Sequence, residues 1–180
     1  MPKFLKVATT SQYLIPLRIN TGTTEVFGFD IDHTFFAGFE VSELKGGVLT
    51  ARVSLTRNDD SYLIGIAIKG YAEVACDRCL DLCKQSIDIS DEIVADIADE
   101  TNFDTGDINI SVASNDNYLD MSVLFHDLII TALPVKRVHD KKMGKDQVCN
   151  PEMIKLLKQY ITDEPQTRDP RWDKLNELKN

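Results

Sequence analysis

The sequence lacks any long apolar run: none of its 180 residues belongs to a stretch approaching the roughly eighteen apolar residues that a membrane-spanning helix needs. Its amino terminus has no extended apolar core and no cleavage pattern of small residues. We therefore expect a cytoplasmic protein without membrane contact. At this length a single domain over residues 1–180 is expected, with residues 162–180 as a peripheral tail.

Cysteine is scarce, with four residues in the chain. A chain of this size does not need disulfide bonds for stability, and thiols stay reduced in the cytoplasm. The cysteines therefore serve metal binding, redox chemistry or packing. Internal repeats and an obvious catalytic constellation are also lacking.

Lysine and arginine are absent from residues 85–135. Their absence excludes a broad basic surface in this segment. The same segment holds eleven acidic residues, against a net charge of −9 for the whole chain. Such a protein is a poor general binder of nucleic acid, because affinity for phosphate depends on the cations it presents. Five cations then follow within ten residues: Lys136, Arg137, Lys141, Lys142 and Lys145. A local basic loop of this kind can position a protein on a ribonucleoprotein.

Alternation of apolar and polar residues predicts strands at residues 13–19, 24–32, 48–55, 62–68 and 71–75. Residues 87–97 fit either a strand or an acidic helix, and we favour a strand. A long polar loop is expected at residues 101–117, followed by helices at 121–133 and 153–161 and a short one at 172–178. Strands first and helices last indicate an α+β fold with an antiparallel, curled sheet and C-terminal helices.

Two cysteines three residues apart, Cys76 and Cys79, lie in the predicted turn between two strands. This spacing is typical of a zinc knuckle, in which both thiolates point at one metal ion. Cys149 and His139 are the candidates for the other two ligands, and Cys83 is an alternative to either. Two other interpretations stay open: reduced cysteines that bind no metal, and a dithiol redox pair.

The redox interpretation has one point in its favour, because Arg78 lies between the two cysteines and a neighbouring cation lowers a thiol pKa. However, the motif does not open a helix after a βαβ strand, as thioredoxin-like centres do.

The segment Asp30-Ile-Asp32-His33-Thr34 resembles the Asp-x-Asp-x-Thr signature of the haloacid dehalogenase phosphohydrolases. In that family the first Asp is the nucleophile and the second an acid/base, assisted by magnesium. That chemistry needs a parallel sheet with a crossover helix, whereas hairpin-linked strands are predicted here. A phosphohydrolase is therefore kept as the alternative prediction. The simpler interpretation of Asp30 and Asp32 is that they lie on the solvent-exposed face of a strand.

Several segments together resemble the YceD family of bacterial and plastid proteins. They are Val74-Ala-Cys-Asp-Arg-Cys79, Leu119-Asp120, Leu133-Pro-Val-Lys-Arg-Val-His-Asp140, Cys149 and the Asp169-Pro-Arg171 tail. The resemblance implies a non-enzymatic factor in the synthesis, processing or stability of large-subunit ribosomal RNA, with ribosomal RNA or ribosome-assembly proteins as partners. It implies no catalytic residue and no small-molecule substrate. Many members have more cysteines after the Leu-Pro pair, so the ligand set here departs from the family.

Taken together, these features predict one working surface. It combines Arg78 of the cysteine turn with the basic loop from Lys136 to Lys145, and the acidic segment is expected to face a basic protein. The candidate metal ligands are Cys76, Cys79, His139 and Cys149, with structural zinc as the expected ion. This prediction requires that the cysteine turn and the basic loop, about sixty residues apart in the chain, meet in space.

Overall fold

The computed structural model describes residues 11–39, 42–103, 110–140, 143–145 and 147–160. The expected helix at residues 172–178 and the expected peripheral tail lie outside these ranges. In chain order the elements are a 3-10 helix η1 (Ser11–Tyr13), β1 (Leu14–Pro16), β2 (Thr24–Ile31), α1 (His33–Ala37), β3 (Gly46–Arg57), β4 (Ser61–Ala75), β5 (Leu82–Ala98), β6 (Ile110–Ala113), β7 (Tyr118–Asp120), α2 (Ser122–Thr131) and α3 (Pro151–Tyr160).

The main sheet has five strands in the order β2-β3-β4-β5-β6, and it does not close into a barrel. The pairs β2–β3, β3–β4 and β4–β5 are antiparallel, as the sequence predicted. The alternation in β3 places Leu49, Ala51, Val53 and Leu55 in the core and their neighbours outside. The α+β prediction is confirmed, and the ambiguous residues 87–97 are part of the long strand β5.

Two expectations about the strands need correction. The polar segment predicted as a loop over residues 101–117 contains β6, which pairs with β5 in parallel through Ala95 to Ala98. The strand expected at residues 13–19 is shorter, and β1 pairs only with β7 in a separate two-stranded sheet. Pro16 therefore lies in a small sheet where its missing N–H costs little.

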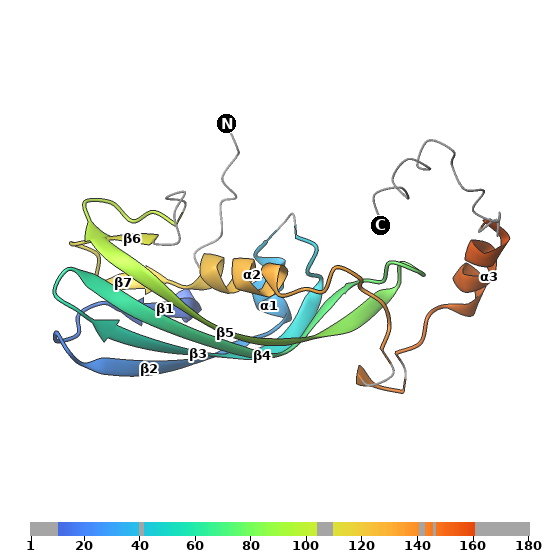
Figure 1. Cartoon of the computed structure of the whole chain (residues 1–180), viewed down its shortest axis with the longest axis horizontal. Coiled ribbons are helices and arrows are strands. Elements are labelled where there is room, and N and C mark those ends of the chain that lie inside the picture. Colours follow the sequence, from blue (N-terminus) through green and yellow to red (C-terminus); the bar gives the residue numbers. More distant parts are fainter. Residues whose placement is uncertain (1–10, 40–41, 104–109, 141–142, 146, 161–180) are drawn as a thin grey trace, which may run out of the picture.

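Helices α1 and α2 cover one face of the main sheet, and the other face is open (Figure 1). The core between them is aromatic: the Tyr13 ring lies 5.1 Å from Phe35 of α1 and 6.2 Å from Phe125 of α2. Phe125 also contacts Phe29 of β2, at 5.6 Å between ring centroids. These contacts fix both helices on the sheet through side chains that bury large apolar areas.

Local hydrogen bonds explain where the helices begin. The Asp32 carboxylate caps α1 by accepting the backbone N–H of Thr34 at 2.8 Å. Asp120, predicted as the cap of α2, lies one residue before the observed N-cap Met121, and its carboxylate accepts the N–H of Ser122 at 2.9 Å. In α3 the expected arrangement of Asn150 before Pro151 is confirmed, because the Asn150 side chain accepts the N–H of Glu152 at 3.0 Å.

Helix α3 is placed differently from the other two. It stands at one end of the molecule, beyond the turn that joins β4 to β5 (Figure 1), and none of its residues is buried. Among the described residues, no helix has the length and apolarity needed to cross a bilayer.

Candidate metal centre

The turn between β4 and β5, residues 76–81, is called the knuckle here. Its backbone closes on itself: the N–H of Leu80 donates to the carbonyl of Cys76, and the N–H of Cys76 donates to the carbonyl of Asp81, both at 2.9 Å. The N–H of Arg78 points at the Cys76 sulfur, 3.5 Å away. The Cys76 and Cys79 side chains are consequently turned inward, and both residues are buried.

The knuckle depends on an unusual backbone conformation at Leu80. This residue has φ +64° and is the one described non-glycine residue with a positive φ. The left-handed region costs a bulky L-residue about 1–2 kcal/mol. The Leu80 side chain is also 70% exposed, so packing does not compensate for this cost.

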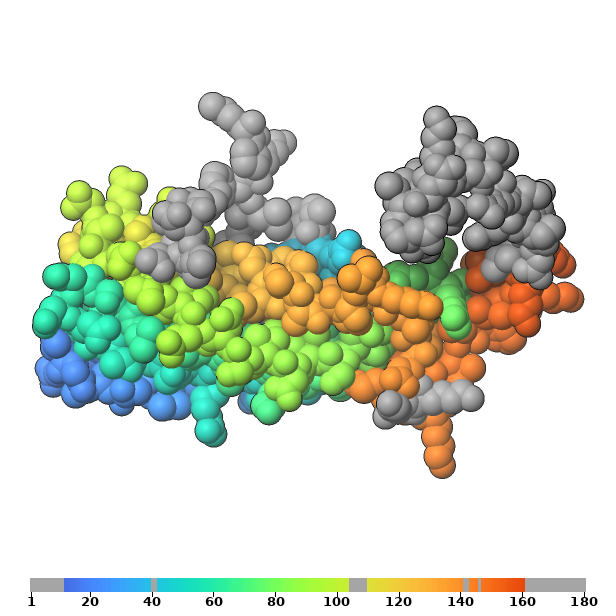
Figure 2. Space-filling model, viewed as in Figure 1, coloured from blue at the N-terminus to red at the C-terminus, as the bar shows by residue number. Residues whose placement is uncertain are grey.

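The second half of the cluster comes from residues 134–149, called the arm here. Backbone and side chain of Asp77 hold it: the Asp77 N–H donates to the Arg137 carbonyl at 2.7 Å, and the Arg137 N–H donates to the Asp77 carboxylate at 2.6 Å. The arm therefore lies against the knuckle, as the sequence analysis required. Figure 2 shows the arm, the knuckle side of the hairpin and α3 together at one end of the molecule.

Two buried glutamines complete the attachment of the arm. The Gln85 amide donates to the Val138 carbonyl at 3.0 Å, and the Gln147 side-chain oxygen accepts the Lys84 N–H at 2.9 Å. The sequence analysis did not identify either residue. The available signal was a polar residue at position 85 between Cys83 and Ile87, on the inward face of β5, where an apolar residue is expected.

The ligand atoms of Cys76, Cys79, His139 and Cys149 all lie within 4.8 Å of one another. The Cys76 and Cys149 sulfurs are 3.9 Å apart, and His139 Nδ1 lies 3.6 Å from the sulfurs of both Cys79 and Cys149. Tetrahedral coordination with metal–sulfur bonds of about 2.3 Å and metal–nitrogen bonds of about 2.0 Å implies a sulfur–sulfur separation of about 3.8 Å and a sulfur–nitrogen separation of about 3.5 Å. The residues present therefore fit a metal ion bound by three cysteines and one histidine.

The histidine is oriented for this role. His139 Nε2 lies 3.1 Å from the Leu82 carbonyl, which can accept only if Nε2 carries the proton. That tautomer leaves the Nδ1 lone pair free toward the three sulfurs. A carbonyl behind the ring is a common way in which proteins fix a histidine ligand.

The thiols of the cluster differ in acidity. Burial alone would raise the pKa of Cys76, but N–H groups of Arg78, Cys79 and His139 together lower that pKa to about 6. Burial, followed by hydrogen bonding and repulsion from Cys76, raises the pKa of Cys149 to about 11. Cys76 is thus the more acidic of these two thiols, and a bound cation would stabilise the thiolate form of a cysteine ligand.

Cys83, the alternative ligand, is not one of these four residues. It is buried, and its sulfur accepts the Gln85 amide at 3.2 Å. Burial raises the pKa of the Cys83 thiol, although the Gln85 bond partly opposes this. Cys83 therefore has the surroundings of a packed, protonated thiol.

The residues predicted to bind RNA or a partner have different surroundings. Arg78, Lys136 and Lys145 are exposed at the knuckle end. Arg137 forms an ion pair with Glu43, so its guanidinium is already engaged. Lys141 and Lys142 lie outside the described residues. Among the four members of the predicted cationic set that the structure describes, three are thus exposed and outside the ion pair with Glu43.

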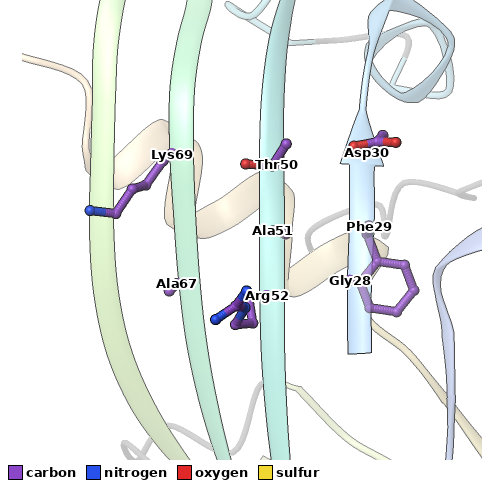
Figure 3. A pocket seen from close by; sticks show the side chains of 8 residues that line it. All are labelled: Gly28, Phe29, Asp30, Thr50, Ala51, Arg52, Ala67 and Lys69. Atoms are coloured by element: carbon purple, nitrogen blue, oxygen red, sulfur yellow. The ribbon is translucent and has the colours of Figure 1, made fainter. Parts of the chain in front are cut away.

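The two carboxylates of the alternative prediction do not face each other across a shared site. Asp32 caps α1, and its hydroxyl partner Thr34 donates at 2.6 Å. Asp30 lines a shallow hollow of about 420 Å³ on the open sheet face (Figure 3). In the register of the sheet, Arg52 of β3 lies between Gly28 of β2, which has no side chain, and Ala67 of β4, whose side chain is a methyl group.

That hollow also includes Lys69, whose ammonium is 3.2 Å from the Asp88 carboxylate on β5. Asp32 is not among its lining residues. The strands around the hollow are antiparallel. Asp30 therefore lacks the parallel strands and crossover helix on which Asp-x-Asp phosphohydrolase chemistry depends. The candidate metal centre is therefore the better-formed site among the described residues.

Comparison with known proteins identifies the chain's family. The family model described as large ribosomal RNA subunit accumulation protein YceD matches residues 64–179. No curated protein and no solved structure matches the chain. The matched region begins within β4 and includes the knuckle, the arm and α3, and it covers more than half of the sequence. The chain therefore belongs to the YceD family of large ribosomal RNA subunit accumulation proteins.

Proposed function

We propose that the protein is a cytoplasmic, non-enzymatic factor in the synthesis, processing or stability of large-subunit ribosomal RNA. The family description supports a role in accumulation of that RNA. The proposed mode of action is binding, because the knuckle end presents exposed cations beside a cluster whose three cysteines and one histidine fit a structural metal ion. The partners in this proposal are ribosomal RNA or proteins of the assembling large subunit.

Structural zinc is the ion we propose for the four-residue cluster. Three thiolates and an imidazole suit zinc, and a complete set of four protein ligands is typical of structural rather than catalytic sites. The single observation that carries the proposal is the convergence of the four ligand atoms within 4.8 Å. A metal ion bound by these four residues would fix the arm against the knuckle. Lys136 and Lys145 would then be held at a defined place beside Arg78.

The charge distribution supports a local contact instead of a broad one. The knuckle end carries exposed cations, whereas residues 85–135 contain only acidic charges. Ribosomal RNA would therefore be attracted to one end and repelled from β5. This polarity favours binding in one orientation within an assembling particle, with the acidic strand facing a basic protein.

A charge-reversal experiment tests the proposal. The variant Lys136→Glu/Lys145→Glu should reduce association with large-subunit precursor particles by about tenfold or more, because two phosphate-facing cations are replaced by anions. The matched control is Arg52→Glu, which reverses one exposed cation on the open sheet face. Association is measured by sedimentation of cell extracts and detection of the protein in precursor fractions.

Equal association of native and doubly reversed protein would remove the arm from the proposed surface. An equal loss in the Arg52→Glu control would show that net charge, not the knuckle end, decides binding. Zinc content of each variant should be measured alongside, so that loss of the metal centre is not mistaken for loss of a contact.

A further inference from the structure

One edge of the main sheet is only partly used. Strand β5 has β4 on one side along its whole length, and on its other side β6 pairs only with its last residues, Ala95 to Ala98. Toward the start of β5 the arm occupies this edge, because the Gln147 side chain accepts the N–H of Lys84 at 2.9 Å. Between these two contacts, β5 has no strand beside it among the described residues.

The hydrogen-bond pattern shows which backbone groups face this gap. The N–H of Cys76 donates to the carbonyl of Asp81, and in an antiparallel ladder such bonded pairs alternate with pairs that are not bonded. The register of β4 and β5 is unbroken, so odd-numbered residues of β5 bond to β4 and even-numbered residues face away from it. Two even-numbered residues confirm this pattern, because Lys84 bonds to the arm and the Ala98 carbonyl bonds to the residue after β6.

The even-numbered residues in the gap therefore have unpaired main-chain groups. Ser86, Asp88 and Ser90 are exposed, and their N–H groups have no acceptor among the described residues. The N–H of Glu92 differs, because the neighbouring Asp91 carboxylate accepts it at 2.8 Å. Figure 2 shows β5 at the surface, next to α2. A row of free N–H and carbonyl groups at an exposed edge is a template on which a further strand can pair.

The side chains along the gap define what kind of strand would fit. Ile89 and Ile93 point to the helix-covered face, where they are half-buried at the margin of the core. On the open face, Asp88 pairs with Lys69, whereas Glu92 is exposed and forms no ion pair with a described residue. An added strand would place apolar side chains beside the isoleucines and cations beside the carboxylates. Its residues would therefore alternate between these two kinds.

We propose that the edge of β5 from Ser86 to Glu92 binds an extended basic segment of another protein, which pairs with it as an additional strand. Charge favours this occupant, because residues 85–135 contain no lysine or arginine. The inference rests on the part of the proposed function in which the acidic strand faces a basic protein, and it adds the place and the mode of that contact. It does not depend on RNA binding at the knuckle end.

A second copy of the chain is less suited to the same edge. Two copies that paired antiparallel about Ser90 would bring Asp88 of each chain opposite Glu92 of the other, and like charges directly opposite each other oppose pairing. Acidic side chains at a free edge thus act against self-association. They leave the edge open to a strand of opposite charge.

Amide hydrogen exchange of the purified protein, followed residue by residue by NMR, tests the inference. The probe is a peptide of about seven residues that alternates lysine with valine, added at up to millimolar concentration. It should slow exchange several-fold at Ser86, Asp88 and Ser90, whereas Ile87 and Ile89, which already bond to β4, should stay unchanged. Protection at every second residue indicates a paired strand, because attraction by charge alone does not select alternate amides.

Two matched controls separate pairing from charge. Ser90→Pro removes a free N–H without changing the charge, and proline is tolerated where the N–H of an edge strand faces away from the sheet. This variant should bind the peptide at least about tenfold more weakly, whereas Ser90→Ala should bind it like the native protein. A peptide with proline in place of each valine keeps the charge but cannot pair, so it should protect no amide. Circular dichroism checks that both variants are folded.

The proposal is overturned if the valine peptide protects none of the three amides, or if it protects odd- and even-numbered residues alike. Protection that appears without peptide as the protein concentration rises would identify a second copy as the occupant and would overturn it too. Lys136→Glu/Lys145→Glu should retain the alternating protection, so that failure of the proposed RNA contact is distinguished from failure of this inference.

Discussion

At the scale of single residues, the buried cysteines of the hairpin differ in what their sulfurs face. The Cys76 sulfur lies 3.9 Å from that of Cys149, inside the four-residue cluster. The Cys83 sulfur instead accepts an amide hydrogen bond from Gln85. Similar burial with different neighbours makes the two residues a matched pair for testing the metal centre.

We expect the native protein to carry about one zinc ion per chain when purified without chelator. Cys76→Ser should lower this to near zero, because a hydroxyl is a poor zinc ligand and three ligands bind more weakly than four. Cys83→Ser should retain the metal. Elemental analysis of the three purified proteins measures the result, and equal zinc loss in both variants would contradict the assignment of ligands.

The grouping of the four candidate ligands could be predicted from residue type and spacing, since few cysteines and histidines were available. The groups that support them could not. Gln85 and Gln147 are ordinary surface residues by type, and only the packed arm shows that they are buried. Similarly, Arg137 was predicted to be available to a partner, but Glu43, far away in the sequence, engages its guanidinium.

At the scale of elements, alternation of apolar and polar residues predicted the long strands well. β5 formed despite the helical spacing of its isoleucines, because pairing with β4 along the whole of Ser61 to Ala75 dominates over local periodicity. The short β6 was missed. It has four residues, and its parallel pairing with β5 depends on a chain reversal that no local pattern indicates.

The start of α1 gives a prediction at this scale. Hydrogen bonds from the Thr34 hydroxyl and N–H lower the pKa of Asp32 in the folded protein. A carboxyl with a lowered folded pKa stabilises the fold above its unfolded pKa of about 4, and this contribution disappears as pH falls through the folded value. Asp32→Ala should therefore lower the urea midpoint at pH 7, with the difference shrinking toward about pH 3.

The exposed neighbour Asp30 provides the control, because its carboxylate does not cap a helix. Asp30→Ala should therefore change the urea midpoint little. Urea titrations of the three proteins at both pH values, followed by circular dichroism, measure the effect. A destabilisation of Asp32→Ala that is the same at both pH values would show that Asp32 acts through packing and not through its charged cap.

At the scale of the whole molecule, the sheet and the knuckle end are held together by different means. The sheet body encloses a continuous apolar core that includes Leu55, Ile64 and Phe125. The arm is attached by a few hydrogen bonds to Asp77, Lys84 and Gln85, by the ion pair of Arg137 with Glu43, by Val138 at the edge of the core and by the candidate metal ligands. A hydrophobic core stabilises its elements without a metal ion, whereas a peripheral segment with few buried side chains opens locally at low cost.

Removal of the metal should therefore free one end of the protein and leave the rest folded. With a zinc chelator, we expect amide hydrogen exchange in the knuckle and the described parts of the arm to rise at least about tenfold. Exchange in the centres of β3 and β4 should stay unchanged, since their hydrogen bonds lie between packed strands. Exchange measured by mass spectrometry with and without chelator provides the test, and Cys76→Ser without chelator should reproduce the chelated pattern.

Two results would contradict this account. If chelation exposed the strands to exchange as well, the metal would be required for the whole fold and not only for the arm. If the arm stayed protected, its hydrogen bonds to Asp77 and the two glutamines would suffice without an ion. The expected result would link the metal to the proposed function, because zinc would set the position of the cations at the knuckle end. Chelation should then weaken association with precursor particles to the level of Lys136→Glu/Lys145→Glu, while the sheet remains intact.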